Sequence, residues 1–386
     1  MKILIFSAGN VYEKEIAYAF QKAGIEYKFI TTYPKFLIKK YFINKKNIKS
    51  LFFLELLKRF LFKFFSFIKW RFVTEHKLEA FIDNINDYFF SYFINKKYDL
   101  LIILTTTPWI RSINKANKIS LKILCHLTIS SNSFRVKTIQ QELKKLSLEN
   151  NYPRYNIDKI IKTENMIQDL NFVAYQSSYQ LETYKNAKFD TKNFFYLPQP
   201  SNTKVYSNAR IQKNNEKFII TFTGNDFVRK GGKYLIDAFN NLSLKNAELW
   251  MIGLNLEKYA KLLNLNCDKI KFFGPISDLN IRTYYEKSSI FCLPSFEEGL
   301  PIVIPKAMTF GLPIITTQYG SDIIRNFHNG FIVKPGSSSE LAEKIKFLYD
   351  NPNQLEIMSK NVHLTHDKFF APKIYTDKIL STFFKE

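Results

Sequence analysis

Two adjacent cations, Arg229 and Lys230, stand beside a pair of glycines shortly after an apolar run that reads FIITFTG. The glycines Gly231 and Gly232 would allow a ligand to approach the backbone closely. Cations next to them can neutralise a diphosphate through charge-assisted hydrogen bonds. The stretch therefore indicates a phosphate-binding loop, with Gly224 at the end of the preceding strand. Taken alone, it is equally typical of a basic surface turn.

A second stretch, LPSFEEGLPIVIPKAMTFGLPIITT at 293–317, carries the neighbouring carboxylates Glu297 and Glu298 after another apolar run. We expect Pro305 to begin a helix, whose first N–H groups have no partner within the helix and can face an anionic ligand. A carboxylate beside them can accept hydrogen bonds from sugar hydroxyls. The alternative interpretation of this sequence is an ordinary loop between a strand and a helix, with two solvated carboxylates.

Both stretches lie in the second of two series of alternating strands and helices. The first series contains the apolar runs KILIFSA, YKFIT, YDLLIILTT, KILCHLT and FVAYQSS. The second contains FIITFTG, AELWMIG, IKFFGPI, SIFCLPS and the run at 313–316. Alternation of this kind predicts parallel sheets covered on both faces, and ligands of such sheets bind beyond the carboxyl ends of the strands.

A polar stretch at 196–217, YLPQPSNTKVYSNARIQKNNEK, has two prolines and no clear period, so it predicts a linker. The expected fold class is therefore α/β, with two Rossmann-like domains whose parallel sheets face a cleft. We place the N-terminal domain at 1–198, the C-terminal domain at 199–369 and a final helix at 370–386.

The two candidate stretches, in this order and about 70 residues apart, resemble the donor domain of the retaining GT-B glycosyltransferases of glycosyltransferase family 4. The resemblance extends to FFGPIS, AMTFGLPIITT and NGFIVKPGSSSELAEKI, and it covers about 218–348 well. It implies a hexosyltransferase that moves a sugar from a nucleotide-sugar to an envelope glycan or lipid-linked acceptor, with retention of configuration. It implies no metal and no cofactor besides the donor itself, and it returns the final helix to the N-terminal domain.

The resemblance also assigns roles to single residues on the donor side. Arg229 and Lys230 would grip the donor diphosphate. Glu298, with the backbone of Gly299 and Leu300, would hold hydroxyls of the donor sugar, so Glu298 counts among the catalytic candidates.

Two further positions follow from the resemblance in the N-terminal half. Gly9 would lie in the loop under the phosphates, at the domain cleft. His126, in KILCHLTISSNSF, is the catalytic candidate near the acceptor, although the alignment could instead set Asn132 in that place. A histidine after an apolar run is also often a packed residue.

Lys306 departs from the family pattern, which has a second glutamate at that position for the nucleotide ribose. An ammonium group has three donors and no acceptor, so it cannot accept bonds from ribose hydroxyls. It could donate to ribose oxygens, pair with Glu297 or Glu298, or meet a phosphate or a sugar carboxylate. A solvated lysine and an inactive donor site are the other interpretations, and the first turn of a helix disfavours a cation.

The net charge of +22 is concentrated in the first half of the chain, where residues 1–200 hold 32 Lys and Arg against 16 Asp and Glu. Within it, the segment 35–72 has 11 basic residues and one glutamate among many Phe, Leu and Ile. A basic helix with a broad aromatic face is typical of an anionic membrane interface. There are two alternatives for this segment. It could be a helix packed in the core, or its alternating basic and aromatic residues could bind nucleic acid.

The three cysteines have no paired spacing and no run reaches the roughly 18–20 apolar residues of a membrane-spanning helix. We therefore expect a cytoplasmic enzyme, at the inner face of the cell membrane if the segment 35–72 binds lipid. Its partners would be the nucleotide-sugar and the acceptor, and not nucleic acid. The rival functions are a catalytically inactive GT-B scaffold and a basic nucleic-acid-binding protein.

Overall fold

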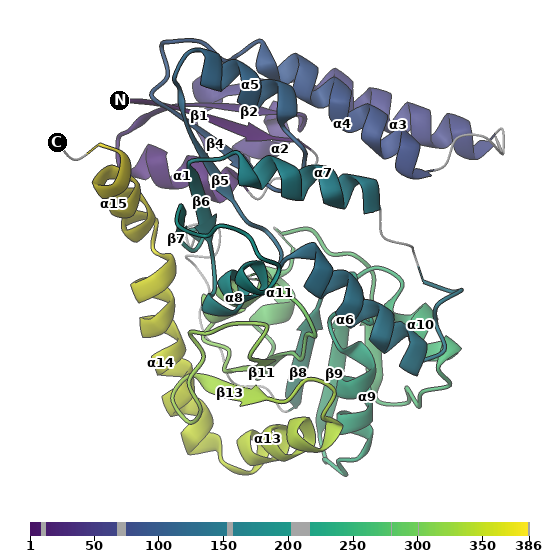
Figure 1. The fold of residues 1–386 in the computed structure, drawn as a ribbon. Helices are drawn as coiled ribbons and strands as arrows, with labels where there is room; N and C mark the ends of the chain where they lie inside the picture. Colours follow the sequence, from purple (N-terminus) through teal and green to yellow (C-terminus); the bar gives the residue numbers. More distant parts are fainter. Residues whose placement is uncertain are drawn as a thin grey trace.

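The computed structural model describes residues 1–8, 13–67, 75–152, 157–201, 217–278, 280–299 and 301–384. Two α/β domains follow one another along the chain, each built around one parallel sheet (Figure 1). The predicted Rossmann-like pair of domains is thus confirmed. Most of the expected linker, at 202–216, lies outside the described residues.

The N-terminal sheet is buried on both faces, because its strands are nearly continuous runs of Ile, Leu and Phe. In spatial order the described strands are β3 (Ile48–Ser50), β2 (Glu26–Thr31), β1 (Lys2–Ser7), β4 (Leu100–Leu104), β5 (Lys122–His126), β6 (Phe172–Tyr175) and β7 (Phe194–Tyr196), all parallel. The helices are α1 (Glu13–Lys22), α2 (Lys35–Lys39), α3 (Phe52–Phe67), α4 (Glu75–Ser91), α5 (Ile110–Lys118), α6 (Asn132–Lys145), α7 (Ile157–Gln168) and α8 (Ser178–Asn186).

The C-terminal sheet has the same parallel character. Its described strands are, in spatial order, β10 (Ile270–Phe273), β9 (Ala247–Ile252), β8 (Phe218–Thr223), β11 (Ile290–Leu293), β12 (Ile314–Thr317) and β13 (Gly330–Val333). The helices are α9 (Gly232–Asn240), α10 (Leu256–Leu262), α11 (Arg282–Tyr285), α12 (Val303–Met308), α13 (Ser338–Asp350), α14 (Pro352–Phe370) and α15 (Pro372–Phe383). Helix α12 begins two residues before Pro305, which was expected to begin it.

Each domain core is completed by a helix from the other half of the sequence. Helix α15 sends Tyr375, Ile379 and Phe383 into the core of the N-terminal domain, where α15 lies along α1. In the opposite direction, Ile139 and Leu143 of α6 belong to the hydrophobic core of the C-terminal domain. Figure 1 shows both crossings, with α6 beside α9 and the yellow α15 beside α1.

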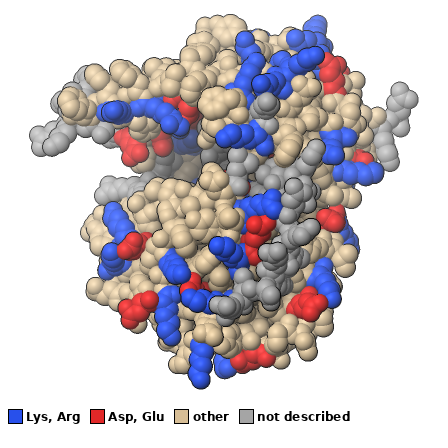
Figure 2. All heavy atoms as spheres, turned by 180° about the vertical axis from the view of Figure 1, so that it is seen from behind, with Lys and Arg blue, Asp and Glu red and all other residues tan. Residues whose placement is uncertain are grey.

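Helices α3 and α4 lie together as a pair that projects beyond the N-terminal sheet (Figure 1). Along α3, Phe53, Leu57, Phe60, Phe64 and Phe67 are exposed, at spacings of four, three, four and three residues. Residues so spaced share one helical face, which we call the α3 stripe. Seen from behind, the projecting pair also carries Lys and Arg side chains, beside a hollow above the C-terminal domain (Figure 2). Within the described residues, no helix is both long and apolar enough to cross a membrane.

Candidate functional site

A cavity of about 430 Å³ lies between the domains, and residues that follow the carboxyl ends of strands in both sheets line it. From the N-terminal domain it is lined by Thr106, Thr128, Ile129 and Gln176, and the connecting chain adds Gln199. From the C-terminal domain the charged lining residues are Asp226, Arg229, Lys230, Asp278, Glu298 and Lys306. The cleft expected between the two sheets therefore gathers the cations and the carboxylate that the two sequence motifs supply.

The loop after β8 places Arg229 and Lys230 through two glycines. At Gly224 a β-carbon would lie 2.1 Å from the side chain of Lys230, so a larger residue would force that side chain to move from this position. Gly231 has φ +70 and a β-carbon there would meet the carbonyl oxygen of Pro294 at 2.2 Å. Asp226 orients Arg229, accepting hydrogen bonds from its backbone N–H at 3.0 Å and from Nε at 3.2 Å.

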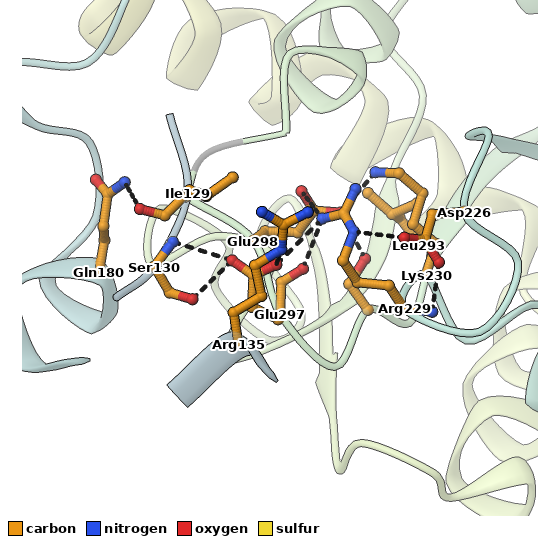
Figure 3. Close-up of polar contacts among 12 residues, drawn as sticks. Ile129, Ser130, Arg135, Gln180, Asp226, Arg229, Lys230, Leu293, Glu297 and Glu298 are labelled. Carbon is orange, nitrogen blue, oxygen red and sulfur yellow. Dashed lines mark hydrogen bonds and ion pairs between the residues drawn. The ribbon is translucent and has the colours of Figure 1, made fainter. Parts of the chain in front are cut away.

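Glu298 joins both cations at the wall of the cleft (Figure 3). Its carboxylate accepts from Lys230 Nζ at 2.6 Å and from Ser295 Oγ at 3.1 Å, and it lies 3.0 Å from Arg229 Nη1. Burial favours the neutral acid, but Arg229 and Lys230 outweigh it and lower the pKa of Glu298 to about 2. The carboxylate is therefore ionised at neutral pH and fixed in place, able to accept bonds from ligand hydroxyls.

Glu297, its neighbour, ties the two domains together instead of facing the cleft. Its carboxylate accepts from Ser130 at the backbone N–H (3.0 Å) and at Oγ (2.7 Å), and it lies 3.4 Å from Arg229 Nη1. Figure 3 shows the carboxylate between Ser130 and Arg135 on one side and Arg229 on the other. At Gly299 a β-carbon would lie 2.6 Å from the carbonyl oxygen of Thr128, so glycine lets the loop approach the N-terminal domain.

Lys306 is buried and paired, which contradicts the interpretation as a solvated lysine. Its Nζ donates to Asp278 at 2.5 Å, so its partner is neither Glu297 nor Glu298. The same carboxylate accepts from Lys14 of α1, which joins the N-terminal domain to the cleft. Burial raises the pKa of Asp278, but Lys306 and Lys14 outweigh it and bring that pKa well below its usual range. The cluster of two lysines and one aspartate holds a net positive charge at the cleft.

His126 does not line the cleft. Its side chain is fully buried below the end of β5, and its Nε2 lies 2.8 Å from the hydroxyl of Tyr375 on α15. Asn132, the alternative, begins α6 and is also buried; its backbone N–H donates to Glu164 at 2.7 Å. The structure therefore brings neither residue to the cavity, where Thr128 and Ile129 are the nearest lining residues after β5.

The buried position of His126 predicts acid sensitivity of the fold. Burial lowers the pKa of His126 to about 3, below its ordinary value of 6.5, so the unfolded chain binds this proton more readily. The free energy of unfolding is therefore unaffected by this group above pH 6.5, and it decreases as the pH falls from 6.5 towards 3. At pH 5 we expect a loss of about 2 kcal/mol relative to pH 7 from this group.

Urea unfolding at pH 5 and pH 7 measures this loss, and His126→Gln is the comparison. Glutamine has no titrating group, so the difference between the two pH values should shrink by about 2 kcal/mol in the variant. An unchanged difference would show that His126 does not titrate on unfolding.

Of the other expected site residues, Gly9 and Leu300 lie outside the described residues. No sequence motif indicates five further residues that line the cleft, and only their positions after strands could have done so: Asp226, Asp278, Thr128, Gln176 and Gln199. In the described ranges, no group of three or more His, Cys, Asp and Glu side chains could hold a metal ion.

Known proteins match this chain in sequence and in fold. Residues 207–364 match the family model described as "Glycosyl transferases group 1". An "Uncharacterized glycosyltransferase" of Haemophilus influenzae is 32% identical over 197 residues, which cover 48% of this chain and 54% of that protein. A "GalNAc-alpha-(1->4)-GalNAc-alpha-(1->3)-diNAcBac-PP-undecaprenol alpha-1,4-N-acetyl-D-galactosaminyltransferase" of Campylobacter jejuni is 32% identical over 101 residues, 25% of this chain and 27% of that one.

Among solved structures, an Anabaena protein in complex with UDP and glucose superposes with a TM-score of 0.67 at 15% identity, covering 99% of each chain. This likeness extends over both domains and the final helix, and it shows a shared fold. The curated relatives are matched over about half of their length or less. Residues 207–364 thus resemble the group 1 glycosyltransferases, and the two-domain fold is the one found in GT-B glycosyltransferases.

Proposed function

We propose that this chain is a group 1 glycosyltransferase and that it acts as a retaining, metal-independent hexosyltransferase. It transfers a sugar from a nucleotide-sugar to an envelope glycan or lipid-linked acceptor. The observation that carries the proposal is the meeting of Arg229, Lys230 and Glu298 at one wall of the cleft between the domains. Complexes of a solved neighbour with UDP and glucose support a nucleotide-sugar as the donor.

The charges of the cleft suit departure of a nucleoside diphosphate. As the bond from the sugar's anomeric carbon to the diphosphate breaks, negative charge grows on the leaving oxygen. Arg229 and Lys230 can stabilise that charge from fixed positions. The acceptor hydroxyl then attacks from the same face and gives its proton to the leaving phosphate, so no protein nucleophile is needed. Glu298 would hold hydroxyls of the transferred sugar during this step.

A lipid-linked acceptor is supported by the Campylobacter relative, whose name includes undecaprenol diphosphate. The projecting α3 stripe is a second support, since it would bring the cleft to the surface of a membrane. We therefore propose a location at the inner face of the cell membrane, where nucleotide-sugars are present.

Lys306 favours one rival function, a scaffold of the same fold that binds partners but transfers no sugar. Lys306 lines the cleft, but its positive charge is already partly neutralised by Asp278 and so is less available to a ligand. A thermal-shift screen of nucleotide-sugars, followed by measurement of nucleotide release, separates the two functions. The transferase is expected to be stabilised by about 2.7 kcal/mol by a donor at 100 times its dissociation constant. A scaffold would show neither a shift nor release with any donor.

A further inference from the structure

Residues 130–152, which we call the α6 strap, come from the N-terminal half of the chain but lie against the C-terminal domain (Figure 1). The strap contains α6, whose Ile139 and Leu143 belong to the hydrophobic core of the C-terminal domain. On the same helix, Glu142 accepts a hydrogen bond from the hydroxyl of Tyr234 on α9. Apolar and polar contacts therefore both hold the strap on the second domain.

The C-terminal end of the α6 strap reaches the loop that carries the two cations of the cleft. The hydroxyl of Tyr152 donates to Oδ1 of Asp226 and accepts from the backbone N–H of Val228 at 3.1 Å. Its ring lies beside that of Tyr259 on α10, with the ring centroids 4.9 Å apart. Tyr152 is thus fixed on the C-terminal domain by hydrogen bonds and by a ring contact.

Asp226 links this contact to Arg229. Its Oδ1 also accepts from the backbone N–H of Arg229 at 3.0 Å, and its Oδ2 accepts from Nε at 3.2 Å. Elsewhere on the guanidinium, Nη1 donates to the carbonyl oxygen of Glu297 at 3.0 Å (Figure 3). The guanidinium is planar and its N–H groups have fixed directions, so a carboxylate that holds Nε also sets where the other N–H groups point. The direction in which Arg229 meets a phosphate therefore depends on Asp226.

The other end of the α6 strap contacts the same arginine through a second carboxylate. Ser130 donates to Glu297, and Oε2 of Glu297 lies 3.4 Å from Arg229 Nη1. Among the described residues that line the cleft, none belongs to the strap. The strap therefore acts on the cleft through the carboxylates beside Arg229 and not by direct contact with a ligand.

We propose that Tyr152 is a positioning residue for binding of the donor diphosphate, because it fixes Asp226, which in turn directs Arg229. This inference rests on the proposed function and adds to it a residue of the N-terminal half that acts on the donor side. A hydroxyl that donates to a carboxylate forms a charge-assisted hydrogen bond, about twice as strong as a bond between neutral groups. Without that bond Asp226 is free to turn, and the guanidinium loses the direction that suits a phosphate.

The substitution Tyr152→Phe tests the proposal, because it removes the hydroxyl and keeps the ring. Isothermal titration with UDP and GDP should show that the affinity for a nucleoside diphosphate falls about five- to tenfold. Tyr234→Phe is the matched control, since it makes the same chemical change at another contact of the strap and leaves Asp226 untouched. The affinity of this control should stay within about twofold of the wild-type value even if its melting temperature is lower.

A double-mutant cycle separates positioning from a general loss of stability. If Tyr152 acts through Asp226, Tyr152→Phe should have no further effect on affinity in a protein that already carries Asp226→Ala. Three results would each overturn the proposal: wild-type affinity in Tyr152→Phe, an equal loss in Tyr234→Phe, or additive losses in the double variant.

Amide hydrogen exchange supplies a readout that needs no ligand. The backbone N–H groups of Val228 and Arg229 bond to Tyr152 and Asp226, so they should exchange about tenfold faster in Tyr152→Phe than in Tyr234→Phe. Equal exchange in the two variants would contradict the positioning role. If exchange responds as expected but the wild-type protein binds no nucleoside diphosphate, the proposed function is wrong, whereas the positioning of Arg229 by Tyr152 is supported.

Discussion

Replacing Arg229 and Lys230 together with alanine is expected to weaken binding of a nucleoside diphosphate by well over tenfold. Each cation can form a charge-assisted hydrogen bond with a phosphate oxygen, and such bonds contribute about 1.5–3 kcal/mol each. A loss of 1.4 kcal/mol is already tenfold in affinity. Isothermal titration with UDP, GDP and the nucleotide found in the donor screen measures the change.

The double substitution also leaves the buried carboxylate of Glu298 without its two cationic partners, with only the Ser295 hydroxyl still donating to it. Breaking a buried ion pair typically costs about 3–5 kcal/mol, so the variant has to be checked for folding. The triple variant with Glu298→Gln removes the unpaired charge and should regain stability without regaining affinity.

Glu298→Gln alone is the matched control for the diphosphate assignment. It keeps both cations and the shape of the site, so binding of the free nucleotide should persist while discrimination among sugar donors is lost. Unchanged nucleotide affinity in a folded double variant would contradict the role given to Arg229 and Lys230.

Charge reversal on α3 is expected to abolish binding to anionic vesicles. Five large apolar side chains of the α3 stripe can insert into the interface while Lys58, Arg59 and Lys63 face lipid headgroups. Each cation near an anionic surface contributes up to about 1 kcal/mol, and this attraction falls off within a Debye length of about 10 Å at 0.1 M salt. Three charge reversals change attraction into repulsion.

Flotation with vesicles of phosphatidylglycerol and phosphatidylcholine measures this effect. The wild-type protein should float with them at low salt, and float less at high salt, whereas Lys58→Glu, Arg59→Glu and Lys63→Glu together should leave it in the pellet. The control reverses Lys258, Lys261 and Lys360, three exposed lysines of the C-terminal domain, and should still float. If the wild-type protein does not float with anionic vesicles at low salt, the membrane assignment is wrong. Lys69, also basic, is not among the substitutions because it lies outside the described residues.

The donor side of the cleft could be predicted from sequence because each of its parts is local. Lys230 and Glu298 are 68 residues apart, but each follows a strand of the same parallel sheet, which brings both to one edge. Alternating apolar runs likewise indicated the longer strands. The short edge strands β3, β7 and β13 were missed, since three or four residues such as IKS carry no readable period.

The partners of Lys306 and His126 could not be predicted in this way. Asp278 lies 28 residues before Lys306, in the loop after β10, and Lys14 comes from the other domain. His126 meets Tyr375, 249 residues away, only because α15 returns to the first domain. A polar residue after a strand looks the same in sequence whether it faces a ligand or a distant helix.

The crossing of α6 and α15 makes the two domains mutually dependent. A chain cut within the connecting segment after residue 201 would yield an N-terminal fragment without Tyr375, Ile379 and Phe383, and a C-terminal fragment without Ile139 and Leu143. Each fragment would expose an apolar groove that only the other fragment fills. Such halves behave as a split protein, inert apart and restored by mixing, and the intact chain should melt as one cooperative unit despite its two sheets.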